Sequence, residues 1–131
     1  MSENARFEAI IFTLSGVRFG FDSTQVVALR RYEHDEDVDL PKVHNLFGLS
    51  PLFSSPQNMG VVSLHQQLGG ATFVTEQPDE IHVVTPAEIR PFPPLMRERA
   101  KNLGLWGVVP ADPDPIYLVD FALIPAAQRC P

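Results

Sequence analysis

The sequence predicts a mostly β protein, built as a small barrel or a pair of small barrels. Thirteen prolines and eight glycines among 131 residues disfavour long helices, because proline neither continues a helix nor donates to a central strand. The apolar residues form short alternating runs or blocks rich in valine and isoleucine, each bounded by glycine, proline, asparagine or aspartate. A chain of this length suits one domain with one hydrophobic core.

The first part of the sequence predicts three strands and a charged loop. Residues 8–14 and 17–21 form a predicted hairpin, because the serine and glycine between them suit a tight turn. A third strand is expected at residues 26–32. Five carboxylates then fall within residues 33–39. Since like charges repel, this stretch is predicted to be a solvated loop.

The rest of the sequence predicts further short strands and one helix. Residues 43–49 form a short strand or a turn that Gly48 closes, and the proline- and serine-rich residues 50–58 form a loop. One or two helical turns are expected at 95–101, since the preceding Pro94 suits a first helical position. The other strands are predicted at 60–64, 71–75, 80–84, 103–109 and 116–120.

Composition excludes several classes of partner. Sixteen acidic against ten basic residues give a net charge of −6, and no stripe of lysine and arginine could follow phosphates, so nucleic acid is not an expected partner. Apolar runs such as residues 9–12 are much shorter than the ~20 residues that span a bilayer, so no membrane insertion is predicted. Residues 1–4 do not resemble a signal peptide, and the single cysteine, Cys130, fits a reducing compartment. We therefore expect a cytoplasmic protein.

No catalytic signature is present in the sequence, so we predict no catalytic residue and no cofactor. Cys130 lies one residue from the end of the sequence, without a scaffold to hold it against a base, and is interpreted as an inert thiol. His34 and His44 could offer imidazoles to a divalent metal, but their spacing matches no closed site, so no metal is predicted. His65 falls in a polar turn, and His82, inside a strand, is interpreted as structural.

The aromatic residues of the strands are predicted to fill the core. They are Phe12, Phe19, Phe21, Phe73 and Trp106. An alternative is that some of them line a groove for another protein, since small β-barrels often use an apolar crevice or a sheet edge for binding. The pairs Leu46–Phe47 and Leu52–Phe53 flank a loop, so they could be exposed anchors or could fold back onto the barrel.

Several blocks of the sequence, in order and spacing, resemble CheW-like domains, the family of chemotaxis coupling proteins. The longest are residues 12–26, with a strand, a turn and the start of a third strand, and residues 80–93, with an acidic–isoleucine pair before Pro91-Phe92-Pro93. Shorter blocks match the family's Leu-Gly-Leu stretch, its final hairpin and its terminal turn, at 43–51, 105–108, 116–120 and 121–124. The resemblance covers about residues 8–124 and leaves residues 1–7 and 125–131 as tails.

This resemblance implies a CheW-like fold of two small five-stranded β-subbarrels that share a core, with one short helix. One subbarrel is expected to be truncated, because the family's Gly-x-x-Asn-Leu-Arg-Gly turn is missing and only the acidic stretch and Pro41–Lys42 occupy its place. The arginine of that turn therefore has no counterpart here. Glu76 and Pro78 stand where the family usually has an aspartate and an apolar strand residue, which indicates an altered edge.

The function implied by the resemblance is that of a non-enzymatic signal-transduction adaptor, with a histidine kinase or a chemoreceptor as protein partner. The predicted contact residues lie at the crevice between the subbarrels: Leu46, Phe47 and Leu49, with Arg30 and Arg31 as a polar rim. One alternative is a β-barrel that binds a small ligand or a metal. Another is a small enzyme with an unfamiliar site. No oligomeric state follows from the sequence.

Overall fold

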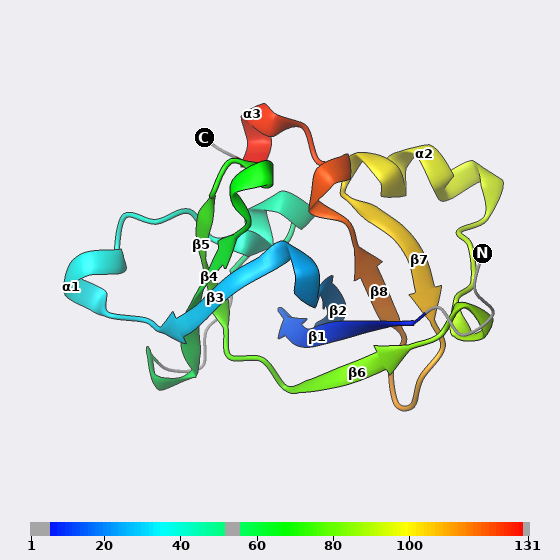
Figure 1. Cartoon of the computed structure of the whole chain (residues 1–131), viewed down its shortest axis with the longest axis horizontal. Coiled ribbons are helices and arrows are strands. Elements are labelled where there is room, and N and C mark those ends of the chain that lie inside the picture. Colours follow the sequence, from blue (N-terminus) through cyan, green and yellow to red (C-terminus); the bar gives the residue numbers. More distant parts are fainter. Residues whose placement is uncertain (1–5, 52–55, 130–131) are drawn as a thin grey trace.

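The computed structural model describes residues 6–51 and 56–129, which form two β-sheets with short helices around them (Figure 1). The strands are β1 (Phe7–Leu14), β2 (Val17–Asp22), β3 (Val26–Arg31), β4 (Met59–Leu64), β5 (Thr72–Glu76), β6 (Glu80–Val84), β7 (Leu105–Val109) and β8 (Ile116–Val119). The α-helices are α1 (His34–Asp37), α2 (Pro94–Asn102) and α3 (Ala126–Arg129). This architecture confirms the predicted mostly β fold with one main short helix.

The larger sheet has five strands in the order β6-β1-β2-β8-β7. Its β1–β2 hairpin has the predicted register, and the turn residues Ser15 and Gly16 both adopt positive φ, as a tight hairpin turn requires. The predicted β7–β8 hairpin also forms, and β8 then joins β2 in a parallel pair. That parallel pair brings the end of the chain back against its beginning.

The smaller sheet has three strands in the order β3-β4-β5, with the predicted β4–β5 hairpin. A parallel bridge between Lys42 and Val74 continues it beyond β5. Within the described residues the end strands of each sheet do not pair with each other, so both sheets are open. The two expected subbarrels are thus present as open sheets rather than closed barrels, with five strands in one and three in the other, which agrees with the expected truncation of one subbarrel.

The main hydrophobic core lies between the two sheets. Five phenylalanines meet at its centre. The ring centroid of Phe21 lies 4.5 Å from that of Phe12 and 4.9 Å from that of Phe121, and Phe19 stacks on Phe47 with their centroids 4.5 Å apart. Val62, Leu64 and Phe73 of the smaller sheet belong to the same cluster. A second, smaller cluster covers the opposite face of the larger sheet: Ala9, Ile11, Val84, Val109, Ile116 and Leu118.

Three local predictions are corrected by the structure. Residues 43–49 contain a 3-10 helix (Val43–Phe47), which Gly48 ends in the left-handed conformation. Within residues 33–39 the helix α1 forms, so this stretch is not simply a solvated loop. Trp106 is 41% exposed rather than buried, since it lies where the register of β7 shifts and its ring contacts Phe7 at 5.9 Å.

The described part of the predicted C-terminal tail is ordered against the fold. Arg129 of α3 donates to the carbonyl oxygens of Leu68, at 2.6 Å, and Ile124, at 2.9 Å. The short 3-10 helices of the fold are Ser23–Gln25, Val43–Phe47, Pro56–Asn58, Gln66–Leu68, Pro86–Glu88 and Phe121–Leu123. None of the helices in the described residues is long and apolar enough to cross a bilayer.

Candidate functional site

Strand β3 is an exposed edge of the smaller sheet. It pairs with β4 on one side, and no strand of the described chain lies on its other side. The N–H of Tyr32 donates to Met59 on β4, so the alternation of an antiparallel ladder directs the backbone N–H groups of Arg31 and Leu29 away from β4. Val27 is 57% exposed and Leu29 is 40% exposed. Apolar side chains thus reach solvent on an edge strand.

Strand β6 is the corresponding edge of the larger sheet, and it also exposes apolar side chains. Ile81 is 62% exposed and Val83 is 46% exposed. Ile81 lies opposite Ile10 in the β1–β6 ladder, and directly paired residues share one face of a sheet, so Ile81 is on the face of the main core. His82 points to the other face, where its Nε2 lies 3.2 Å from Glu88.

The two edges share an open groove of about 250 Å³, which we call the inter-sheet groove. Its lining residues are Ile10, Leu29, Pro78, Asp79, Glu80 and Ile81. The two carboxylates in this lining have partners within the chain, since Thr13 Oγ1 donates to Asp79 and Arg18 Nη2 lies 3.1 Å from Glu80. The surface left to a ligand is therefore mainly apolar. Such a surface suits a protein partner better than a charged small molecule.

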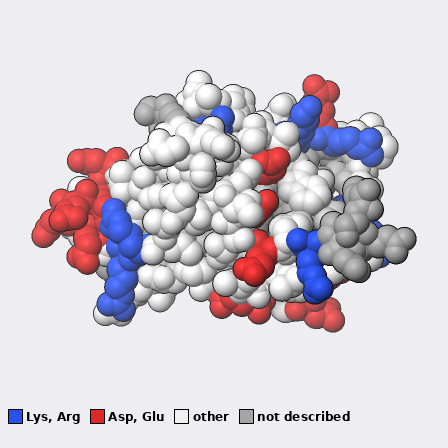
Figure 2. Space-filling model, in the orientation of Figure 1, with Lys and Arg blue, Asp and Glu red and all other residues white. Residues whose placement is uncertain are grey.

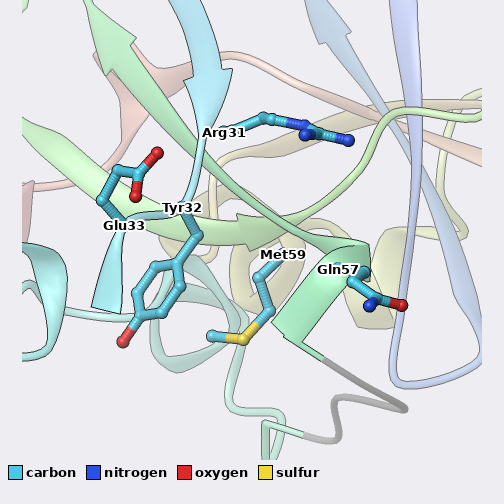
Figure 3. Close-up of a pocket in the computed structure, with 5 residues that line it drawn as sticks. All are labelled: Arg31, Tyr32, Glu33, Gln57 and Met59. Carbon is cyan, nitrogen blue, oxygen red and sulfur yellow. The ribbon is translucent and has the colours of Figure 1, made fainter. Parts of the chain in front are cut away.

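A second cavity, of about 270 Å³, lies at the end of β3, and we call it the β3-end pocket. Its lining residues are Arg31, Tyr32, Glu33, Gln57 and Met59. Figure 3 shows the Tyr32 and Met59 side chains at its centre, with Arg31 and Gln57 to one side and Glu33 to the other. The predicted rim residue Arg31 thus flanks an apolar spot beside the groove.

Arg30, the other predicted rim residue, connects β3 to α1. Its guanidinium donates two hydrogen bonds of 2.7 Å to the two carboxylate oxygens of Asp37, which also accepts from the backbone N–H of Glu33 at 2.8 Å. Asp37 is buried, and these bonds lower the pKa of its carboxyl to about 2. Arg30 therefore has a structural role, and the bidentate pair places α1 beside the edge strand.

The predicted apolar contact residues lie deeper than expected. Leu46 and Phe47 are 8% and 6% exposed and belong to the main core, and Leu49 is half-buried against it. They turn inward because their 3-10 helix packs against the smaller sheet. The alternative prediction, that Leu46 and Phe47 are exposed anchors for a partner, is therefore wrong. The pair Leu52–Phe53 lies outside the described residues.

The exposed apolar residues of β3 and β6 were not identified from the sequence. A short run of apolar residues has the same pattern in an edge strand and in a central strand, so the sequence cannot separate the two. The one available signal is the order of residues in β3, where Val27 and Leu29 are followed directly by two arginines. Charged residues of this kind are typical of edge strands.

His44 and His34 each lie close to a polar side chain of the same chain. His44 is fully buried, and its Nε2 lies 3.4 Å from Glu76. Burial lowers the pKa of His44, which favours the neutral imidazole. His34 Nδ1 lies 3.2 Å from the hydroxyl of Tyr32. Across the part of the chain that the structure describes, no three histidine, cysteine, aspartate or glutamate residues are grouped so that they could hold a metal ion.

Two open sheets share one core, and an apolar groove lies at their edge strands. The fold is CheW-like, because the crystal structure of the scaffolding protein TtCheW from Thermoanaerobacter tengcongensis is similar to it with a TM-score of 0.64. The match covers 88% of this chain and 90% of that chain, at 15% sequence identity. No protein-family model matches the sequence, and no curated protein matches it. The two chains therefore share a fold although their sequences are only 15% identical.

Proposed function

We propose that this protein is a non-enzymatic, cytoplasmic adaptor that couples a histidine kinase or a chemoreceptor through protein–protein contacts. The observation that carries the proposal is the inter-sheet groove, which the exposed apolar side chains of Leu29 and Ile81 line. Val27 and Val83 are exposed on the same two edge strands. Exposed apolar residues that gather on one surface favour a protein-binding role. The similar structure of a scaffolding protein supports the same role.

The predicted contact residues take different parts in this proposal. Arg31, at the β3-end pocket, forms the polar rim beside the groove, and Arg30 holds the rim in place through Asp37. Leu46 and Phe47 belong to the main core and Leu49 packs against it, so these three residues stabilise the fold rather than form the exposed contact surface. The partner's apolar side chains then cover Leu29 and Ile81, which supplies most of the free energy of binding.

The test is the substitution of Leu29 or Ile81 by aspartate. Binding is measured with the immobilised chain against two probes from the same cell: the cytoplasmic fragment of a chemoreceptor and the regulatory domain of a histidine kinase. A buried, unpaired carboxylate opposes association, so each substitution is expected to weaken the affinity by at least about tenfold.

The matched control is Leu95→Asp, because Leu95 is 99% exposed and lies on α2, away from the groove. This variant is expected to bind both probes as the wild type does. The proposal is wrong if neither probe binds the wild-type chain. It is also wrong if the groove variants and the control bind equally well.

The β3-end pocket favours a second candidate function, the binding of a small ligand. Its volume of about 270 Å³ is slightly below the lower limit of about 300 Å³ for typical ligand sites. A thermal-shift screen with small metabolites and divalent ions tests it, because a ligand of the native state raises the melting temperature by mass action. A shift that Tyr32→Ala removes would favour this candidate over the adaptor.

A further inference from the structure

Another cavity lies beside α3, where this last helix meets the smaller sheet. Its volume of about 330 Å³ falls within the usual range of ligand sites, which begins at about 300 Å³. We call it the α3 pocket, and its lining residues are Pro41, Lys42, Asn45, Leu46, Phe73 and Gln128. The α3 pocket shares no lining residue with the inter-sheet groove or with the β3-end pocket, so it is a separate site.

Backbone hydrogen bonds hold the walls of the α3 pocket in place. The N–H of Val74 donates to the carbonyl oxygen of Pro41 at 2.8 Å, which ties this part of the chain to β5. The N–H of Asn45 donates to the carbonyl oxygen of Lys42 at 3.1 Å, at the start of the 3-10 helix. The helix α3 is anchored to the fold by the two hydrogen bonds of Arg129. The pocket is therefore formed before any ligand binds, as most ligand sites are.

The inner side of the α3 pocket is apolar. Leu46 is 8% exposed and Phe73 is 1% exposed, and both belong to the main core. Pro41 is half-buried in the same lining. Together these side chains offer an apolar surface to the hydrocarbon part of a ligand, and covering that surface removes it from water.

Three polar side chains complete the lining. Lys42 is half-buried, whereas Asn45 and Gln128 are exposed. Among the described residues, these three side chains form no ion pair and no hydrogen bond with another residue. The ammonium group of Lys42 and the two side-chain amides therefore keep their donors for another molecule.

The charge of the α3 pocket is positive. Its lining contains no carboxylate, so Lys42 carries the one formal charge among these lining residues. Figure 2 shows the acidic side chains at one end of the molecule gathered over α1, and α3 lies away from that end (compare Figure 1). A cation beside an apolar surface suits an anion with an apolar body, because both parts of such a ligand then find a partner.

We propose that the α3 pocket binds a small organic anion, a carboxylate attached to a short aliphatic or aromatic body. The carboxylate accepts hydrogen bonds from the ammonium of Lys42 and from the side-chain amides of Asn45 and Gln128. The body of the ligand covers Leu46 and Phe73. This site does not depend on the adaptor function, because it lies outside the groove that would contact a protein partner.

Titration of the full chain with small carboxylates gives the first part of the test. The probes are phenylacetate, hexanoate and benzoate, at about 0.15 M salt, where charges more than about 8 Å away are largely screened. NMR spectra of the isotope-labelled chain follow the side-chain amide signals of Asn45 and Gln128. We expect at least one probe to shift both signals in a saturable way, with a dissociation constant of about 1 mM or lower. The proposal is wrong if none of the probes does so.

Matched ligands test whether a carboxylate is required. The neutral amide of the best probe, such as phenylacetamide for phenylacetate, is expected to bind at least about tenfold more weakly, because it cannot accept a charge-assisted hydrogen bond from Lys42. Equal affinities of the amide and the carboxylate would contradict the proposal. Phenyl phosphate distinguishes the kind of anion, and tighter binding of this phosphate than of every carboxylate would overturn the assignment of the ligand class.

Substitutions locate the site. Lys42→Gln removes the charge at nearly the same length and is expected to weaken binding of the best probe at least about tenfold. Asn45→Asp places a carboxylate in the lining and is expected to weaken binding by a similar factor, because like charges repel. Binding to both variants is followed by the Gln128 signal, and an unchanged melting temperature shows that each variant is folded.

The matched control is Lys101→Gln, because Lys101 is the other lysine of the sequence and is exposed on α2. This variant is expected to bind the probe as the wild type does. Tyr32→Ala, which alters the β3-end pocket, is also expected to leave binding unchanged. The proposal is wrong if Lys42→Gln or Asn45→Asp binds like the wild type. It is also wrong if Tyr32→Ala removes binding, since the probe would then occupy the β3-end pocket.

Discussion

The two buried ionisable side chains Asp37 and His44 differ in the charge state that the fold favours. Asp37 is held as a carboxylate, because Arg30 supplies a full positive charge through two hydrogen bonds. His44 has a lowered pKa because burial penalises the imidazolium, although Glu76 opposes this effect. The buried carboxylate is thus charged at neutral pH, while the buried imidazole is neutral. Both side chains attach a short helix to the sheets, α1 for Asp37 and the Val43–Phe47 turn for His44.

The Arg30–Asp37 pair predicts a specific dependence of stability on acid. The pKa of Asp37 falls from its ordinary 3.8 to about 2, so the folded state favours the carboxylate. This stabilisation is complete above about pH 5 and is lost as the pH falls through 4 towards 2. We expect Asp37→Asn to lower the free energy of unfolding at pH 7, and the difference from the wild type to close near pH 2. Urea unfolding at a series of pH values measures it.

The control for this experiment is Asp112→Asn, since Asp112 is exposed and takes part in no ion pair of the described residues. It should follow the wild type at every pH. If the Asp37→Asn variant differs from the wild type by the same amount at pH 2 and at pH 7, then the carboxylate of Asp37 does not stabilise the fold.

At the scale of elements, the connections are built by specific caps and glycines. The Thr85–Glu88 capping box starts the short helix after β6, and the bonds of Thr85 and His82 lower the pKa of Glu88. Asp22 and Asp120 cap the helical turns after β2 and β8 by accepting backbone N–H bonds. Short connections of this kind leave the strands in fixed positions, so the groove has a defined shape.

Two glycines with similar backbone conformations predict different costs of substitution. Gly16 has a φ of 85° with nothing within 4 Å of an added Cβ, whereas Gly104 has a φ of 80° and its Cβ would lie 2.6 Å from Ile124. We expect Gly16→Ala to cost about 1–2 kcal/mol from the backbone alone. Gly104→Ala should cost about 1–3 kcal/mol more, because it also overpacks the core.

Thermal and urea unfolding of the two glycine variants measure this difference, with Gly16→Ala as the matched control for backbone strain. Equal losses of stability in the two variants would contradict the expected crowding at Gly104.

At the scale of the whole molecule, the two sheets share one core. Phe12 and Phe21 of the larger sheet belong to the same cluster as Val62 and Phe73 of the smaller sheet. Neither sheet covers its inner face alone, since each relies on the other to exclude water. The sheets are therefore expected to unfold as one cooperative unit.

The single tryptophan provides a test of this cooperativity. Trp106 reports on the larger sheet, whereas Val62 is fully buried in the smaller sheet. We expect Val62→Ala to lower the stability by about 2 kcal/mol and to shift the urea midpoint of Trp106 fluorescence by the full corresponding amount. A control substitution at the exposed Met96, Met96→Ala, should leave that midpoint in place. A Trp106 midpoint that is unaffected by Val62→Ala would mean that the sheets unfold independently.

The sequence by itself determined the strands, the hairpins and the class of fold. The alternation of apolar residues, the Ser15–Gly16 turn and the proline before α2 are local signals, and local signals act over a few neighbouring residues. The strand boundaries agree within a few residues for this reason. The CheW-like resemblance of the ordered blocks added the expectation of two subbarrels around one core, which local signals do not contain.

Only the tertiary structure decided which residues are exposed. Leu46 and Phe47 became core because a helical turn places them under the smaller sheet, and Ile81 became exposed because β6 is an edge strand. Asp37 became buried because Arg30, seven residues earlier, neutralises it. Exposure depends on which strands become neighbours across the whole chain, and sequence periodicity is the same for an edge strand and a central one. For that physical reason the candidate groove could be located only in the folded molecule.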